Sequence, residues 1–146
     1  MARHGIERFW DLGGQTSIRN IWNRYYSQCH AVAYVVDAQD REHLDEGWEV
    51  FHSVLSDPEI LDVPLLLLAN KQDNPESLSA EEIRDSYETW WQARLKDLPT
   101  DNITQSQDRV ASLQVIGISA LNGQGIHEAI DWLFLRVQNS RRRERD

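Results

Sequence analysis

The chain has 146 residues, 40% of them hydrophobic and 27% charged, and its formal net charge is −9. That length suits one domain with a sizeable core, the apolar content is too high for a disordered chain, and the acidic balance argues against general nucleic-acid binding. The longest apolar run, residues 64–69, is too short for a membrane-spanning helix, and the single cysteine, Cys29, excludes an internal disulfide and a cysteine zinc site.

The predicted elements alternate between strands and helices along the chain. A short strand at residues 9–10 comes first, and three apolar runs predict buried strands: residues 31–36, 64–69 and, more weakly, 113–118. Apolar residues at steps of three and four predict helices in three segments: residues 18–29, 44–55 and 126–137. Ser79 with Glu82 resembles a capping box, which predicts a fourth helix that begins there and runs through about Leu95. This alternation predicts an α/β fold in which helices cover a parallel sheet.

Polar residues follow each predicted strand, at the sheet edge where ligands bind in such folds. The clearest signal is the string Asn70-Lys71-Gln72-Asp73. One carboxylate can accept both adjacent donors of a guanine base, so Asp73 suits that base, while the aliphatic stem of Lys71 can cover the ring. Asn70 can tie the loop to its neighbour and reach the other edge of the base. The alternative is a polar turn that needs no ligand.

Two glycines lie between a predicted strand and a predicted helix in residues 11–15 (DLGGQ). Glycines let the backbone approach a phosphate closely, and a helix N-terminus attracts anions. Asp11 can hold Mg²⁺ through water, and Gln15 can orient a hydrolytic water. The alternative is an ordinary tight turn capped by Thr16 or Ser17.

The loop from Ser119 to Gly125 follows the last predicted strand. The backbone N–H groups of Ser119 and Ala120 can point toward a base, and the glycines turn the chain into the final helix. A plain strand-to-helix loop is the alternative.

Three other features are less specific. The five histidines lack ligand spacing, so we expect no histidine metal site. Trp90 and Trp91 are expected to anchor a helix on the core, with an exposed partner surface as the alternative. We expect one domain over residues 1–140, a surface loop at residues 99–108, and a basic tail, residues 141–146, that is a frayed helix end or a contact to acidic lipid headgroups.

Taken together and in this order, the strings WDLGGQ, NKQD and SAL resemble the motifs of small GTPases. Their exact residues are most similar to those of the ADP-ribosylation factor (Arf) family, and within it to the Arf-like or Arf-related members. Residues 16–26 (TSIRNIWNRYY) look like the helix of the second switch. The strings YVVD, DRE and AIDWL extend the resemblance over residues 9–137.

The resemblance implies a fold like that of the P-loop NTPases, with helices on both faces of a parallel sheet, and a molecular switch that binds GTP or GDP with Mg²⁺ and hydrolyses GTP. It implies that Asp11 supports the magnesium through water, that Gly14 donates its N–H to the γ-phosphate and that Gln15 positions the attacking water. It assigns the guanine nucleotide's base to a set of residues on two loops: Asn70, Lys71, Asp73, Ser119, Ala120 and Leu121.

The resemblance also implies partners and a place in the cell. Effector proteins would bind the aromatic residues Trp10, Trp22 and Tyr25, and an exchange factor and a GTPase-activating protein would act on the switch. The family's setting is cytoplasmic, peripheral on Golgi and trans-Golgi membranes, in vesicle traffic. We expect no nucleic-acid partner and no transmembrane segment.

The sequence departs from the family ahead of WDLGGQ. None of the seven glycines precedes a lysine, so the phosphate-binding GxxxxGK[ST] is missing, and the family's first-switch threonine and first two strands would also precede Asp11. We therefore expect a truncated domain that lacks those strands, with unpaired strand edges and impaired GTP binding and hydrolysis. One alternative is a non-catalytic protein-interaction module derived from an Arf-like GTPase. A third, weaker alternative is a phosphate-binding domain of unrelated chemistry.

Overall fold

The computed structural model describes residues 22–96 and 113–139. Its strands form one parallel sheet in the order β1-β2-β3, with these bounds: β1 (Val32–Asp37), β2 (Leu65–Asn70) and β3 (Gln114–Gly117). Each strand begins one residue later than its apolar run predicts. The strand expected at residues 9–10, the loop at 99–108 and the tail at 141–146 lie outside the described residues.

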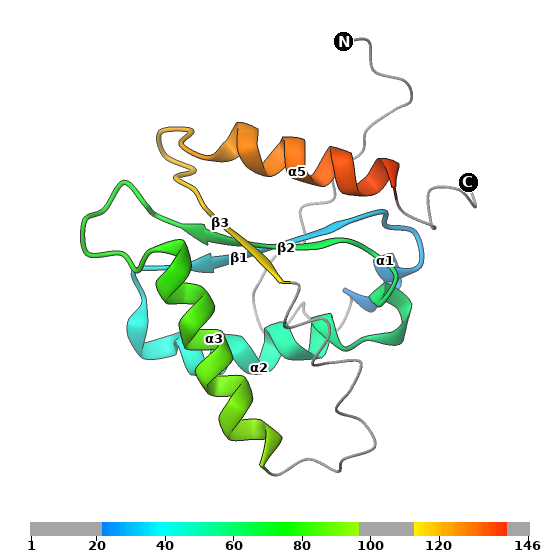
Figure 1. Cartoon of the computed structure of the whole chain (residues 1–146), viewed down its shortest axis with the longest axis horizontal. Coiled ribbons are helices and arrows are strands. Elements are labelled where there is room, and N and C mark those ends of the chain that lie inside the picture. Colours follow the sequence, from blue (N-terminus) through cyan, green and yellow to red (C-terminus); the bar gives the residue numbers. More distant parts are fainter. Residues whose placement is uncertain (1–21, 97–112, 140–146) are drawn as a thin grey trace.

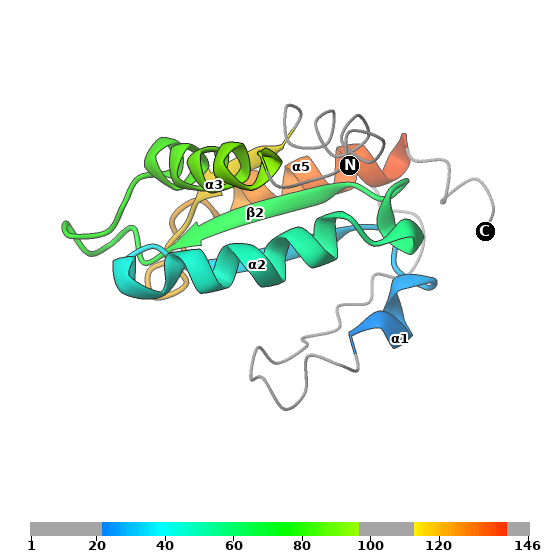
Figure 2. The same cartoon turned by 90° about the horizontal axis from the view of Figure 1, so that it is seen from below.

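Helices cover both faces of this sheet, as Figures 1 and 2 show. The helices have these bounds: α1 (Asn23–Tyr26), α2 (Leu44–Leu55), α3 (Ala80–Leu95) and α5 (Ile126–Gln138), with short 3-10 turns at η2 (Arg41–His43) and η3 (Pro58–Ile60). Helices α2 and α3 lie on one face, and α5 lies on the other. The predicted α/β class, with a parallel sheet between helical layers, is confirmed.

The central strand β2 is buried on both sides because it faces two hydrophobic cores. Leu65, Leu67 and Ala69 belong to the core under α2 and α3, whereas Leu66 and Leu68 belong to the core under α5. Alternate residues of a strand point to opposite faces, so an unbroken apolar run is what such a strand requires. This explains why residues 64–69 carry no polar side chain.

The core under α2 and α3 is built around aromatic rings. Tyr87 lies with its ring centroid 5.2 Å from that of Trp48 and 5.0 Å from that of Phe51, and all three side chains are fully buried. Burying an apolar side chain such as that of Phe51 is worth about 1.5–3 kcal/mol. Trp91 is 2% exposed, and the half-buried Trp90 stacks on Tyr87, so the anchoring role expected for this tryptophan pair is confirmed.

The start of α3 has the capping arrangement that the sequence predicts. The N–H of Glu82 donates to the hydroxyl of Ser79, and the N–H of Ser79 donates to the carboxylate of Glu82, so both backbone donors are satisfied.

The end of α1 differs from expectation, because apolar spacing predicted a helix through Cys29. The helix ends at Tyr26, whose carbonyl accepts a hydrogen bond from the Cys29 thiol in the turn that leads to β1.

Strand β1 is less completely covered than β2 among the described residues. Ala33 and Val35 pair in register with Leu66 and Leu68, so they point to the α5 face, yet both are exposed and Val35 has an exposed fraction of 54%.

Within the two described ranges, every helix is too short or too polar to cross a membrane.

Candidate functional site

The site forms where the carboxyl ends of the three strands meet. The register places Asp37 opposite Asn70 and Ala69 opposite Gly117. The loop after β2 (residues 70–79) and the loop after β3 (residues 118–125) lie side by side at this end of the sheet, on the left in Figure 1. The N–H of Gln72 donates to the carbonyl of Ile118 at 3.0 Å, which joins the two loops through their backbones.

The carboxylate of Asp73 is fixed by a hydroxyl from the other loop. Ser119 is fully buried, and its Oγ donates to Oδ1 of Asp73 at 2.7 Å. The same hydroxyl accepts a hydrogen bond from the N–H of Asn122, which leaves it only one orientation. A carboxylate oxygen has more than one lone pair, so Asp73 keeps acceptor capacity on both oxygens for a ligand.

Asn70 ties the loops together, as the sequence predicts. Its Oδ1 accepts hydrogen bonds from the N–H of Lys71 at 2.7 Å and from the N–H of Ala120 at 3.0 Å. The N–H groups of Ser119 and Ala120, both expected to face a base, are therefore engaged within the protein, since that of Ser119 donates to the carbonyl of Gln124 at 2.9 Å. The next N–H, on the exposed Leu121, donates to no atom of the described residues and is the available donor at this point.

Lys71 adopts a left-handed backbone conformation, with φ of 73°, which side chains other than glycine rarely take. Its carbonyl accepts hydrogen bonds from the hydroxyl of Ser77 at 2.7 Å and the N–H of Asn74 at 3.0 Å. The surrounding contacts thus hold the residue in a conformation that is costly by itself. Such retained strain is typical of functional sites.

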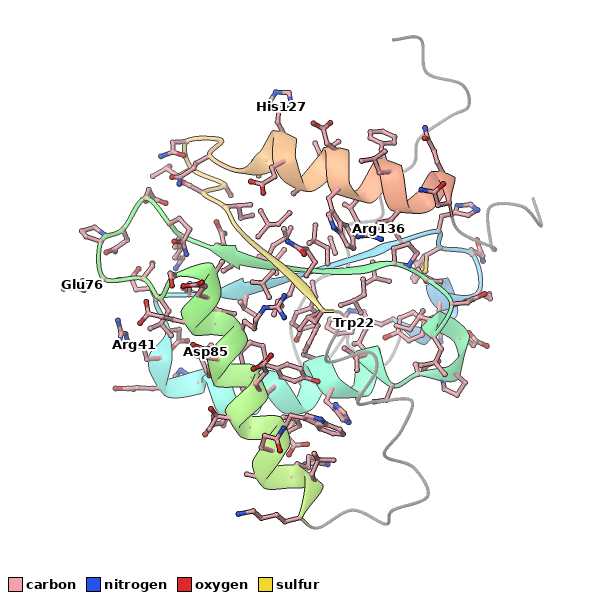
Figure 3. All side chains as sticks on the ribbon, in the orientation of Figure 1. Trp22, Arg41, Glu76, Asp85, His127 and Arg136 are labelled. Carbon is pink, nitrogen blue, oxygen red and sulfur yellow. The ribbon has the colours of Figure 1, made fainter. Side chains whose placement is uncertain are left out.

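The loop from residue 70 to 79 is braced along its length. The side-chain amide of Gln72 donates to the carbonyl of Leu78 at 2.8 Å, and Gly117 leaves room for this side chain, since a Cβ there would come within 3.2 Å of its Cγ. At the tip of the loop, the guanidinium of Arg41 donates to the carbonyl of Glu76 at 3.0 Å, and both residues lie at the left edge of Figure 3.

Asp37 lies next to the site, and sequence reasoning placed it at a strand end without giving it a role. Its Oδ2 forms an ion pair with Nζ of Lys71 at 2.8 Å. Partial burial acts to raise the pKa of Asp37, but hydrogen bonds from Lys71 and from the N–H of Gln39 outweigh it and hold that pKa below its usual value. The same pair raises the pKa of Lys71. The signal was present, because Asp37 follows an apolar strand as Asn70 does.

The other predicted site residues fall into two groups. Asp11, Gly14, Gln15 and Trp10 lie outside the described residues. Trp22 and Tyr25 are half-buried near α1, where the ring of Trp22 meets that of Tyr34 edge-on at 6.2 Å. Figure 1 places α1 at the opposite end of the sheet from the two loops. In the described ranges, no three histidine, cysteine or acidic side chains gather closely enough to hold a metal ion.

Comparison with known proteins shows what the chain is similar to. The model of the ADP-ribosylation factor family matches residues 5–137. The ADP-ribosylation factor-like protein 3 of Saccharomyces cerevisiae is 37% identical over 137 residues, which cover 94% of this chain and 62% of that protein. The ADP-ribosylation factor-related protein 1 of Rattus norvegicus is 38% identical over 125 residues, covering 86% and 55% respectively. The chain thus spans little more than half the length of these relatives.

A solved structure has a similar fold. The Arl6 BBS3 small GTPase from Trypanosoma brucei, with the bound nucleotide analogue GppNp, superposes with a TM-score of 0.67 and 25% sequence identity. The match covers 87% of this chain and 69% of that one.

Proposed function

The chain belongs to the ADP-ribosylation factor family, and on that premise we propose that its two paired loops, residues 70–73 and 119–121, bind the guanine base of GTP or GDP. One observation supports the proposal most strongly: the hydrogen bond from Ser119 to Asp73 holds both loops around one carboxylate that can still accept hydrogen bonds from a ligand. A ligand that offers two adjacent donors to that carboxylate gains a charge-assisted, bidentate contact.

Each neighbouring group suits the rest of a guanine base. The aliphatic stem of Lys71 can cover one ring face, and the N–H of Leu121 can donate to the base carbonyl. The amide nitrogen of Asn70 is available for the ring nitrogen on the other edge, because its Oδ1 is occupied by the two backbone donors. The donor and acceptor set therefore fits guanine, whereas adenine offers no pair of adjacent donors to Asp73.

At the level of the whole switch, we propose a GTP-binding and GTP-hydrolysing protein of intracellular vesicle and Golgi traffic. In it Asp11 supports Mg²⁺ through water, Gly14 donates to the γ-phosphate and Gln15 positions water. Effectors bind through Trp10, Trp22 and Tyr25, and an exchange factor and a GTPase-activating protein regulate the cycle on the cytoplasmic side of Golgi membranes. This part of the proposal is supported by the family and by the matching strings in the sequence.

We further propose that the 146 residues alone bind nucleotide weakly. No glycine in them is followed by a lysine, so the charge-assisted contacts of a GxxxxGK[ST] loop are not available from this sequence. Each such contact is worth about 1.5–3 kcal/mol. Losing three of them removes more than about 4 kcal/mol, or roughly a thousandfold in affinity.

Calorimetric titration with GDP, ADP and xanthosine diphosphate tests the proposed base site. We expect the chain to prefer GDP over ADP by at least about tenfold, the value of one good charge-assisted contact. Asp73→Asn is expected to lose GDP affinity and to gain affinity for xanthosine diphosphate, because xanthine carries an acceptor where guanine carries its amino group. The matched control is Asp85→Asn, which removes the same charge from the exposed side of α3 and should change nothing.

Two results would overturn the proposal. One is equal affinity of the wild-type chain for GDP and ADP, and the other is an unaltered base preference in Asp73→Asn. Either result would instead favour the non-catalytic interaction module as the function of this domain.

A further inference from the structure

The carboxylate of Asp37 is held at both of its oxygens. Oδ1 accepts a hydrogen bond from the N–H of Gln39 at 3.0 Å, and Oδ2 accepts one from Nζ of Lys71 at 2.8 Å. A surface carboxylate whose two oxygens are both engaged has little freedom to swing away. The pair therefore differs from an ordinary surface ion pair, in which two long side chains must be ordered for one contact.

The sheet itself brings the two residues together. Asp37 is the last residue of β1 and lies opposite Asn70, the last residue of β2, in the parallel register. Lys71 is the next residue along the chain, and its left-handed backbone turns it at this point. Because β-sheet register is fixed by the buried faces of both strands, the partner of Lys71 is set by the core and not by the loop.

The backbone of Lys71 is fixed independently of its side chain. Its N–H donates to Asn70, and its carbonyl accepts from Ser77 and Asn74, as described above. The backbone and the ammonium of Lys71 are thus both held in place, and the four-carbon stem of its side chain connects these two fixed points. A flexible lysine stem loses much rotamer freedom when it is ordered on binding, and here that ordering is already present in the free protein.

We propose that Asp37 is a positioning residue for the base: it holds the ammonium of Lys71 so that the lysine stem forms a preformed platform for one face of a purine. This inference rests on the proposed function, because the platform has a use only if a base binds between the two loops. Asp37 does not touch the base in this arrangement and acts through Lys71 alone.

Solvent exposure makes the pair responsive to a bound ligand. The side chains of Lys71 and Asp37 are 49% and 40% exposed, so water screens their attraction in the free protein. A flat base laid against the lysine stem removes water from one side of the pair, which lowers the local dielectric and strengthens the attraction. The cost of desolvating both charges opposes this gain, so we expect a modest coupling between base binding and the ion pair.

GDP titration of the full 146-residue chain tests this role in single and double variants. Asp37→Asn is expected to weaken GDP binding about fivefold, the size that a half-exposed ion pair supports. Asp37→Glu keeps the charge and is expected to restore most of the loss. The control, Asp45→Asn, removes an equal charge from the first turn of α2 and should bind GDP as the wild type does.

The double variant decides whether Asp37 works through Lys71. Lys71→Met keeps an unbranched stem and loses the ammonium, so it should weaken binding by a similar factor. In the Lys71→Met background, Asp37→Asn should cause no further loss, because the contact it serves is already gone. Additive losses would mean that Asp37 acts by another route and would overturn the inference.

A measurement without nucleotide separates this inference from the proposed function. Titration of the Asp37 carboxyl by NMR should show its pKa moving up in Lys71→Met, and melting curves should show that every variant is folded. GDP binding by Asp37→Asn equal to that of the wild type, or an Asp37 pKa that does not move, would overturn the inference and leave the proposed function intact. Failure of the wild-type chain to bind GDP at all would overturn the proposed function, and the positioning role with it.

Discussion

The buried hydroxyl of Ser119 donates a hydrogen bond to Oδ1 of Asp73, and this contact joins two loops that are 46 residues apart in the chain. The contact links the end of β3 to the end of β2 through side chains, beside the backbone bond from Gln72 to Ile118. The orientation of the Asp73 carboxylate is therefore a property of the assembled sheet edge.

Replacing Ser119→Ala should weaken GDP binding by about tenfold or more, because a hydrogen bond to a charged group is worth about 1.5–3 kcal/mol. Without the hydroxyl, Asp73 can rotate away from the position in which it accepts from a base. The control is Ser53→Ala, since the Ser53 hydroxyl donates only to a carbonyl of its own helix, on the exposed side of α2. Titration calorimetry measures both, and equal affinities for the two variants would contradict the role given to Ser119.

Gly125 and Gly123 form a matched pair for a stability test. Both have positive φ, 76° and 87°, so an alanine at either position adopts a strained backbone that costs about 1–2 kcal/mol. They differ in space: a Cβ on Gly125 would come within 2.2 Å of the carbonyl oxygen of Gly117, whereas a Cβ on Gly123 meets nothing within 4 Å. Gly125→Ala must therefore also push the start of α5 away from β3.

We expect the free energy of unfolding to fall at least twice as far in Gly125→Ala as in Gly123→Ala. Urea denaturation of the two variants beside the wild type measures the difference. Losses of the same size would mean that the turn relaxes freely, and that the close approach of α5 to β3 is not fixed by this glycine.

His52 gives the fold a pH dependence of known sign. The imidazole of His52 is partly buried against the rings of Trp90 and Trp91, and this burial disfavours its charged form. The positive charge of Arg94 opposes protonation further, so the pKa of His52 lies below its usual value. Its two ring nitrogens are hydrogen-bonded to the hydroxyls of Tyr87 and Ser56. The folded protein thus binds a proton here less readily than the unfolded chain does.

It follows that the His52 contribution to the free energy of unfolding is complete above about pH 6.5, the ordinary histidine pKa, and is lost as the pH falls toward the lower folded value. His43 acts in the opposite direction, because the carboxylate of Asp40 raises its pKa and its contribution disappears as the pH rises.

Urea unfolding between about pH 5 and 8 measures this acid loss, the fall in the free energy of unfolding as the pH drops, and it should be smaller in His52→Gln than in the wild type. His43→Gln should keep the acid loss, and an identical pH profile for His52→Gln and the wild type would refute the assignment.

Much of the fold could be predicted from local pattern. The apolar run at residues 64–69 indicated a strand buried on both faces, and the pairing of Ser79 with Glu82 indicated the start of α3; both are confirmed. The prediction failed at the end of α1, where apolar spacing through Cys29 continued past the helix that ends at Tyr26. There the same apolar residues pack in a turn, and spacing alone does not distinguish a last helical turn from a tight turn that buries the same side chains.

The candidate site was predictable in its residues and not in its contacts. The string Asn70 to Asp73 was found from chemistry alone, but the ion pair of Lys71 with Asp37 was not, because it depends on two strands ending in register. The tie from Asn70 to the neighbouring loop was predicted, but the donor that it engages was not: the N–H of Ala120 was expected to face a ligand, and which donor Asn70 meets depends on how closely the loops approach.

Among the described residues, the sequence by itself determined which side chains follow each strand and, except at the end of α1, which segments are strands or helices, since both depend on neighbours within a few positions along the chain. Only the folded structure decided which of those side chains meet, because strand register is set by apolar faces buried far from the site. Hence Asp37, to which the sequence assigns no role, becomes the partner of Lys71 because β1 lies beside β2 in the sheet.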